Sequence, residues 1–325
     1  MIIDTHGHMI PPDLLNTIRK EGGKLSALRI VEDPAGLSIA FGNSKPSRPI
    51  MKGLSDLTGR LAWMDKQGID KQVNGGWPDW FGSDLPPDQG ESWCRLMNEG
   101  LLSAARAEPR LVPLCTLPMQ DGARAGAVLK EAMAAGFRGA MISTLPRGIG
   151  SVLDAPDLDP FWKAADDTGA VIHIHPAFDA GESRVHDYGL ANGVGRVSDA
   201  IVAISRIAMS GHIIRYKNTK VFVPIAAGGL PLVVGRLKRN HAITPGTSDP
   251  AEALSLMYTD TIEHDPRVLR FVIEMMGADR VMLGSDMPFP IGDHEPMTIV
   301  KNAGLKPDQI AAISGGTAQK LFRIQ

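Results

Sequence analysis

Short apolar runs alternate with stretches of helical periodicity along almost the whole chain, and this alternation restricts the fold more than any other feature. The eight strand-like runs are "MIIDTHGH", "KQVNGG", "LVPLCTLP", "GFRGAMIST", "AVIHIHP", "TKVFVPIAAGG", "LMYTDTIEH" and "DRVMLGSDMPFP". Between them, apolar residues recur at helical spacing and the segments often end in glycine, as from Leu54 to Gly68 and from Ala123 to Gly136. Eight strands that alternate with helices predict an α/β fold, a (β/α)8 TIM barrel.

One segment interrupts this rhythm. From about Pro11 to Pro49 the chain has short alternating pieces such as "LSIAFG" and several glycine, serine and proline residues. Such a composition indicates an insertion after the first strand, which could form a small sheet or a lid beside the barrel mouth. We therefore expect one barrel over residues 1–325, with residues 11–49 as an insertion within it.

Size and charge narrow the class of protein. The 325 residues are 43% hydrophobic and 22% charged, which suits a globular protein with a large core. Net charge is -2, from 34 basic and 36 acidic residues without long runs of one sign. This charge pattern argues against binding to nucleic acid or to an anionic membrane surface.

The N-terminal residues and the cysteine content bear on location and on metal chemistry. The start "MIIDTHGHMIPP" lacks a basic region followed by a long apolar stretch, and no run of about 18 apolar residues occurs. We therefore expect a cytoplasmic protein. With only Cys94 and Cys115 present, a disulfide framework or a cysteine-based zinc site is not expected, so histidine and carboxylate would have to hold any metal.

Ionisable residues gather at the ends of three predicted strands. The first strand ends in His6 and His8, and side chains two residues apart on a strand share one face. The fifth ends in His175, and the eighth in Ser285 and Asp286. An isolated histidine pair could equally be solvated, but in a barrel these strand ends converge on one rim, where functional residues lie.

Three imidazoles and one carboxylate suit zinc, iron, cobalt or manganese and leave room for a water molecule. His173 shares a strand face with His175, so chemistry alone does not separate the two as ligands. His175 lies directly before Pro176 and nearer the rim, and it is the predicted ligand. We expect His173 to lie below the metal, hydrogen-bonded inside the barrel.

Several sequence blocks, in order and nearly end to end, resemble the amidohydrolase-related family of the amidohydrolase superfamily. These blocks are the D-x-H-x-H start, "RLVPLCTLPMQD", "VIHIHP", "GGLPLVVGRL", "YTDTIEHDP" and "GADRVMLGSDMPFPIGD". The resemblance implies a barrel with a single divalent metal, usually zinc. At the matching positions of this sequence, the ligands it implies are His6, His8, His175 and Asp286.

The resemblance also implies a grip on a carboxylated substrate. Family decarboxylases use one arginine from the insertion after the first strand and a second from the neighbouring subunit of a dimer. Arg48 and Arg236 fall on these positions, although either could be an ordinary surface cation. A guanidinium pairs with a carboxylate through two parallel hydrogen bonds, which explains arginine at such places.

The chain departs from the family at the end of the sixth strand. There the family has a histidine that acts as general acid and base, followed by glycines, and this chain has Ile225. Asp286 could then carry proton transfer alone, His186 in the loop after the fifth strand could substitute, or the reaction could have been lost. Met287 stands where the family often has tyrosine, which predicts a more apolar pocket wall.

These observations predict a metal-dependent enzyme that removes a carboxylate from a small molecule, such as an intermediate of aromatic degradation. Hydrolysis of a lactone, ester, amide or C–C bond, or hydration, is the alternative, since metal-activated water needs no histidine on the sixth strand. A catalytically inactive barrel that binds a ligand is the third possibility.

Trp77, which could equally be lid packing, and Phe289 are candidate aromatic contacts for a planar substrate. We expect a homodimer.

Overall fold

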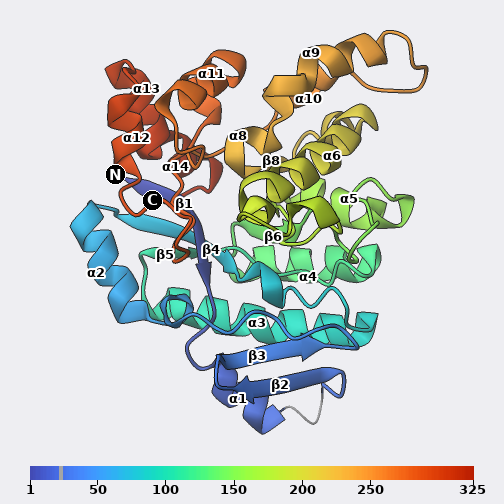
Figure 1. Cartoon of the computed structure of the whole chain (residues 1–325), viewed down its shortest axis with the longest axis vertical. Helices are drawn as coiled ribbons and strands as arrows, with labels where there is room; N and C mark the ends of the chain where they lie inside the picture. The colour runs from blue at the N-terminus through green and yellow to red at the C-terminus, as the bar shows by residue number, and fades with distance from the viewer. Residues whose placement is uncertain (22–24) are drawn as a thin grey trace.

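The computed structural model describes residues 1–21 and 25–325 and has a mixed α/β fold (Figure 1). Its parallel strands are β1 (Ile3–Met9), β4 (Lys71–Gly76), β5 (Leu111–Pro113), β6 (Gly139–Ser143), β7 (Val171–His175) and β8 (Lys220–Phe222). Its helices are α1 (Leu14–Glu21), α2 (Leu57–Gln67), α3 (Pro87–Ala107), α4 (Gly122–Ala135), α5 (Asp159–Thr168), α6 (Arg196–Met209), α7 (His212–Arg215), α8 (Pro224–Gly228), α9 (Leu230–His241), α10 (Pro250–Ser255), α11 (Pro266–Met276), α12 (Met297–Asn302), α13 (Pro307–Ala311) and α14 (Thr317–Leu321).

The parallel strands form two sheets, ordered β1-β4-β5 and β6-β7-β8. Single parallel bridges link the remaining neighbours: Cys115 to Ala140, Phe222 to Tyr258, Thr259 to Val281, and Gly7 to Met287. The segments that the sequence predicts as the seventh and eighth strands are therefore extended chain held by single bridges. The α/β class is confirmed, whereas the regular strands among the described residues do not form one continuous closed barrel.

The helix ends follow the sequence signals closely. Asp56 and Asp121 accept hydrogen bonds from backbone N–H groups in the first turns of α2 and α4. Both helices stop at a glycine in the left-handed region, Gly68 with φ 68° and Gly136 with φ 113°, where a side chain would be strained. Within the described ranges, no helix combines the length and apolarity needed to cross a membrane.

Residues 11–49 contain helix α1 and the antiparallel hairpin of β2 (Leu28–Asp33) and β3 (Gly36–Phe41). This blue unit lies at one end of the molecule, beside α3 (Figure 1). It shares an apolar cluster with three buried tryptophans, Trp77, Trp80 and Trp93. The segment that leaves β3 then brings Arg48 to the cavity described below.

The chain makes an unusual turn directly after β8. Ile225, Ala226 and Ala227 all have positive φ, at 56°, 53° and 53°, so α8 is a left-handed turn and not a regular helix. Each non-glycine residue in this region costs on the order of 1–3 kcal/mol, so the turn needs support from its surroundings. Side chains from residues 259–263 supply that support by accepting its backbone N–H groups.

Candidate metal centre

The end of β1 places two histidines on one buried face. His6 and His8 are 1% and 0% exposed, and their Nε2 atoms lie 3.1 Å apart. Gly7, between them, faces the layer below, where a Cβ atom would meet Asn74 Oδ1 at 2.5 Å. A glycine between the histidines therefore lets β1 lie close against β4.

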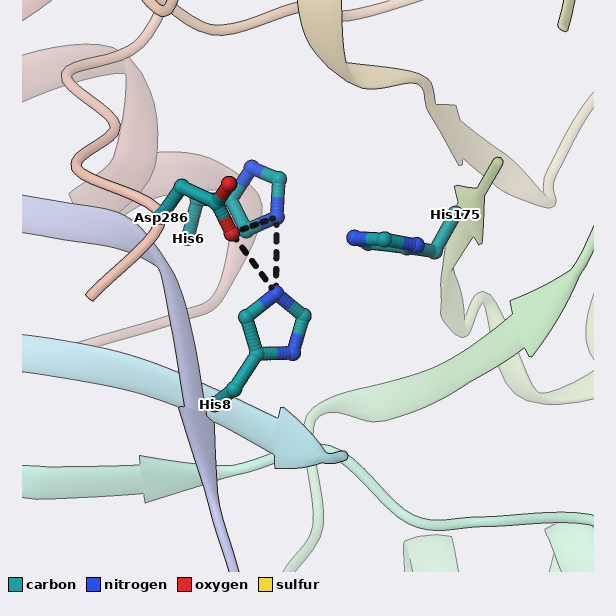
Figure 2. Close-up of side chains that lie close together, drawn as sticks. All are labelled: His6, His8, His175 and Asp286. Carbon is teal, nitrogen blue, oxygen red and sulfur yellow. Dashed lines mark hydrogen bonds and ion pairs between the residues drawn. The ribbon is translucent and has the colours of Figure 1, made fainter. Parts of the chain in front are cut away.

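His175, at the end of β7, and Asp286 complete the cluster (Figure 2). One ligand atom from each of His6, His8, His175 and Asp286 lies within 4.8 Å of every other. Asp286 Oδ1 is 3.1 Å from His8 Nε2 and 3.6 Å from His6 Nε2, while the edge of the His175 ring faces the other three side chains. Segments about 280 residues apart in the chain thus meet at one point.

Each of the three imidazoles is oriented through its Nδ1 atom. His6 Nδ1 lies 2.7 Å from Asp260 Oδ2, His8 Nδ1 lies 3.4 Å from the Gly76 carbonyl, and His175 Nδ1 lies 2.9 Å from the Pro176 carbonyl. An Nδ1–H that donates outward leaves the lone pair of Nε2 pointing into the cluster.

The donor set fits a divalent metal. Asp286 Oδ1 is buried with no correctly placed hydrogen-bond donor among the residues described. Burial lowers the pKa of His8 and, further, that of His175, so both imidazoles are neutral as metal ligands must be. Burial alone would raise the pKa of Asp286, but the contact with His8 and the charges of His6 and Arg196 outweigh burial and lower that pKa. Burial alone would lower the pKa of His6, but its contact with Asp260 and the charges of Asp286 and Asp260 outweigh burial and raise that pKa, so a bound cation would have to displace its proton. Three nitrogen donors and one carboxylate oxygen match zinc, manganese, iron or cobalt.

A buried polar layer supports the cluster from below. Asp4 accepts from Ser285 Oγ at 2.5 Å and from Gln72 Nε2 at 2.7 Å, which ties β1 to the loop that carries Asp286. Arg60 donates to Gln72 Oε1 at 2.6 Å and to the His8 carbonyl at 2.5 Å. Burial lowers the pKa of Arg60 to about 10, so its charge persists at neutral pH.

Replacing Arg60 by methionine is expected to lower the free energy of unfolding by about 3 kcal/mol, because it leaves buried acceptors without a donor. Urea denaturation of the metal-free protein measures this loss. Arg267→Met is the matched control, since Arg267 is 79% exposed and its ion pair with Asp265 lies in solvent, where such pairs contribute little to stability. Equal losses in the two variants would contradict a supporting role for the layer.

Two cavities open beside the cluster, and both reach Asp286. The larger, of about 390 Å³, is lined by Arg48, Met51, Asn192, Arg196, Asp286, Phe289, Pro290 and Ile291. The smaller, of about 170 Å³, reaches His6 and His175 and is also lined by Arg196, Ile225 and Glu263. Such volumes suit a small molecule bound next to the donor set.

Among the residues predicted to bind substrate, Arg48 and Phe289 lie at the larger cavity. Arg48 makes two hydrogen bonds with Asp79, of 2.9 and 2.8 Å, and its guanidinium lies 4.1 Å from the centre of the Phe178 ring. The Phe289 ring packs beside that of His8, with centroids 5.1 Å apart. Trp77 is 1% exposed in the apolar cluster under the hairpin, a position that favours the packing alternative.

Two further predicted site residues, His186 and Arg236, lie away from the cluster, and His173 lies below it. His186 is 57% exposed, 3.8 Å from Asp179 Oδ2, and lines neither cavity. Arg236 is exposed on α9, so within one chain it does not reach the cluster. His173 lies below the donors, its ring 4.7 Å from that of His6, but neither of its nitrogens has a hydrogen-bond partner in the described structure. The expected hydrogen bond of His173 is therefore wrong, because the apolar ring of Phe222, 4.2 Å away, packs against it.

Three polar residues at the site were not predicted from sequence. Asp260 and Glu263 follow the bridge at Tyr258, in the block "YTDTIEHDP", where the strand-end rule that found the histidines would also have found them. Arg196 begins α6 after a long loop, and no local motif marks it. Its guanidinium is largely buried, its Nε has no partner within the described part of the chain, and burial lowers its pKa.

Comparison with known proteins identifies the class that this fold and site define. The amidohydrolase family model matches residues 94–324, more than half of the chain, and the chain therefore belongs to the amidohydrolase family. This confirms the resemblance in the sequence blocks. Among curated relatives, 2-amino-3-carboxymuconate-6-semialdehyde decarboxylase of Dictyostelium discoideum is 27% identical over 310 residues, covering 92% of this chain and 85% of its own.

Solved structures share the fold over the full length. 5-Carboxyvanillate decarboxylase from Sphingomonas paucimobilis superposes with a TM-score of 0.81 at 21% identity, covering 100% of this chain and 99% of its own. A dihydroxybenzoic acid decarboxylase from Polaromonas sp. JS666, solved with manganese and the inhibitor 2-nitroresorcinol, gives a TM-score of 0.76 at 19% identity, with coverage of 99% and 97%. Because both structures are less than 25% identical to this chain in sequence, these superpositions establish the shared fold alone.

Proposed function

We propose that the protein is a metal-dependent decarboxylase of a small carboxylated molecule, of the aromatic or conjugated acid kind. The observation that carries this proposal is the donor set of His6, His8, His175 and Asp286, which opens on a cavity lined by two arginines. Relatives and structural neighbours named as decarboxylases of such acids support it. The two sheets and the single-bridge segments would then correspond to the eight strands of a (β/α)8 barrel, with this cluster at its mouth.

The four donors would hold one divalent metal. Zinc is the metal that the sequence resemblance favours, and manganese is the one present in the Polaromonas neighbour. When bound, the metal would supply positive charge that polarises the substrate oxygens beside the bond to be broken. Asp260 and the two carbonyl acceptors would fix the ring orientations and favour the Nε2 lone pairs as ligands.

The arginines would hold the substrate carboxylate. Arg48 already has its Nε and one Nη bound to Asp79, which fixes the direction of its guanidinium. Arg196 lines the cavity, and its buried Nε has no partner within the described part of the chain, so the guanidinium can turn to a carboxylate without breaking a bond from that atom. Both guanidinium groups lie over the Phe178 ring, with Cζ 4.1 and 5.2 Å from its centre, and these contacts would help to hold them beside the cavity.

Loss of CO2 replaces a C–C bond by a C–H bond. The electron pair of the broken bond stays on the substrate carbon, and a protein group must deliver a proton to it. Phe289 and Ile291 line the cavity with apolar surface and would exclude water from the charged intermediate.

Arg236 from a second copy, as in the family decarboxylases, stays a prediction, as do the homodimer and the cytoplasmic location.

A panel of acids tests the function. Protein loaded with zinc or manganese is expected to release CO2 from 5-carboxyvanillate, a dihydroxybenzoic acid or 2-amino-3-carboxymuconate-6-semialdehyde, and to lose this activity with a chelator. Mass spectrometry of the products separates the alternatives. A hydrolysed or hydrated product without CO2 would support the hydrolase alternative, and metal binding without turnover of any compound would support the inactive barrel.

A further inference from the structure

The end of the sixth predicted strand lacks the histidine that the family resemblance implies for proton transfer. The cavity beside it nevertheless contains another group that can carry a proton. Glu263 lines the same cavity of about 170 Å³ as His6, His175 and Asp286. Ile225, at the position of the missing histidine, lines that cavity as well. A carboxyl group on the next segment of the structure thus opens on the same cavity as the side chain of residue 225.

The two oxygens of this carboxyl group have different surroundings. Glu263 Oε1 accepts the backbone N–H of Ala226 at 3.2 Å, so the left-handed turn at residues 225–227 fixes one oxygen. Glu263 Oε2 is buried and has no hydrogen-bond partner in the described part of the chain. An ionised oxygen without a partner is costly to bury, whereas a protonated one carries its own hydrogen and can donate it to a ligand.

The charges around Glu263 act in the same direction. The titratable and charged groups nearest to it or across the cavity are Asp260, His264, His6, His175, Arg196 and Asp286. Burial, with the Asp260 carboxylate adding to it, raises the pKa of Glu263 to about 8. The group is therefore mostly protonated at neutral pH, which is the form that a proton donor needs.

We propose that Glu263 is the proton donor of the decarboxylation, in place of the histidine that Ile225 replaces. This inference rests on the proposed function. In the step, the O–H bond of Glu263 breaks and a C–H bond forms at the substrate carbon, the C–C bond to the carboxylate breaks, and CO2 leaves. The electron pair of the C–C bond neutralises the added proton, and the Glu263 carboxylate takes a proton from solvent before the next turnover.

The first test compares Glu263→Gln with the wild-type protein, both fully loaded with metal. The amide keeps the shape and the contact to Ala226 but cannot act as an acid, so kcat is expected to fall by about a hundredfold or more. KM and the affinity for 2-nitroresorcinol, used as a binding probe, should change by less than about threefold, as should metal content. Glu274→Gln, on the exposed face of α11, is the control.

A second variant separates chemistry from structural damage. Ile225→His in the Glu263→Gln background places an imidazole in the same cavity, and histidine tolerates positive φ better than isoleucine does. We expect it to recover at least about tenfold of the lost kcat, because an imidazole of suitable pKa can supply the proton. A merely structural role for Glu263 would not be rescued in this way.

A third readout does not need turnover. In the wild type, infrared difference spectra should show the carbonyl band of a protonated carboxyl group disappearing as pH rises through about 8, and Glu263→Gln should lack this change. Because the folded-state pKa is raised, this group's stabilising contribution is present below its ordinary pKa and is lost as pH rises through about 8. The melting temperature of Glu263→Gln minus that of the wild type should therefore increase as pH rises.

The outcomes distinguish the two proposals. If the wild type releases CO2 and Glu263→Gln keeps its kcat within about threefold, the role of Glu263 is overturned and the decarboxylase function stands. A loss of kcat in His264→Asn but not in Glu263→Gln would overturn it equally, in favour of the neighbouring imidazole. If the wild type turns over none of the acids, the proposed function itself fails.

Discussion

Asp286→Asn is expected to lower the metal content of the purified protein from about one ion per chain to less than about a tenth, at limiting metal concentrations. Asparagine keeps the shape of the side chain but removes the only anionic donor of the set, while His6, His8 and His175 are neutral when bound. Decarboxylation should fall at least about a thousandfold, since several kcal/mol of charge stabilisation are lost. Elemental analysis and CO2 release measure the two effects.

Asp308→Asn, in the exposed first turn of α13, is the control for this change and should leave both quantities unaltered. Added zinc or manganese should raise the melting temperature of the wild type but not that of Asp286→Asn, because only the former binds the ion in its folded state. A variant that retains full metal content and activity would show that Asp286 is not a ligand. The metal would then have to be held by the histidines alone.

Arg196→Met is expected to raise KM for a carboxylated substrate about thirty- to a hundredfold, equivalent to roughly 2–3 kcal/mol for a lost charge-assisted hydrogen bond. It lines both cavities, and its Nε has no hydrogen-bond partner among the described residues, whereas Arg48 is already paired with Asp79. Methionine fills a similar volume, so the start of α6 should keep its packing. Steady-state kinetics with each acid of the panel give the value.

Arg206→Met provides the comparison on the same helix, because Arg206 pairs with Asp154 away from the cavities. Its kinetic constants should match those of the wild type. Arg196→Lys should recover part of the affinity, since lysine retains the charge but not the planar pair of donors. An unchanged KM in Arg196→Met would assign carboxylate binding to Arg48 or to a second chain.

The sequence was sufficient to predict which side chains gather in the cluster of His6, His8, His175 and Asp286, because their positions depend on simple geometry. His6 and His8 share a strand face at a spacing of two, and the parallel arrangement of strands brings the ends of β1, β7 and the segment before Asp286 to one edge. Helix ends at Gly68 and Gly136 were equally visible, because glycine tolerates the left-handed conformation that closes a helix.

The substrate side of the site was harder to predict, since it depends on how loops pack. Arg196 follows a loop whose path no periodicity describes. Trp77 was a candidate for stacking on a substrate, but it packs in the apolar cluster that it shares with the hairpin of β2 and β3. The segments near Tyr258 and Val281 read as strands from their apolar composition. Each makes single bridges instead, and the chain turns at residues 261–264, directly after the first of these segments.

Asp260 uses its two oxygens for two purposes: Oδ2 orients His6, and Oδ1 accepts the backbone N–H of Ile225 at 3.0 Å. The second contact is made to the main chain, which every amino acid except proline can offer. Evolution can therefore change the side chain at position 225 without disturbing the ligand that Asp260 holds. With Glu263 as the proposed proton donor, the acid–base group can thus lie on the segment next to residue 225 while the contact that orients His6 is kept.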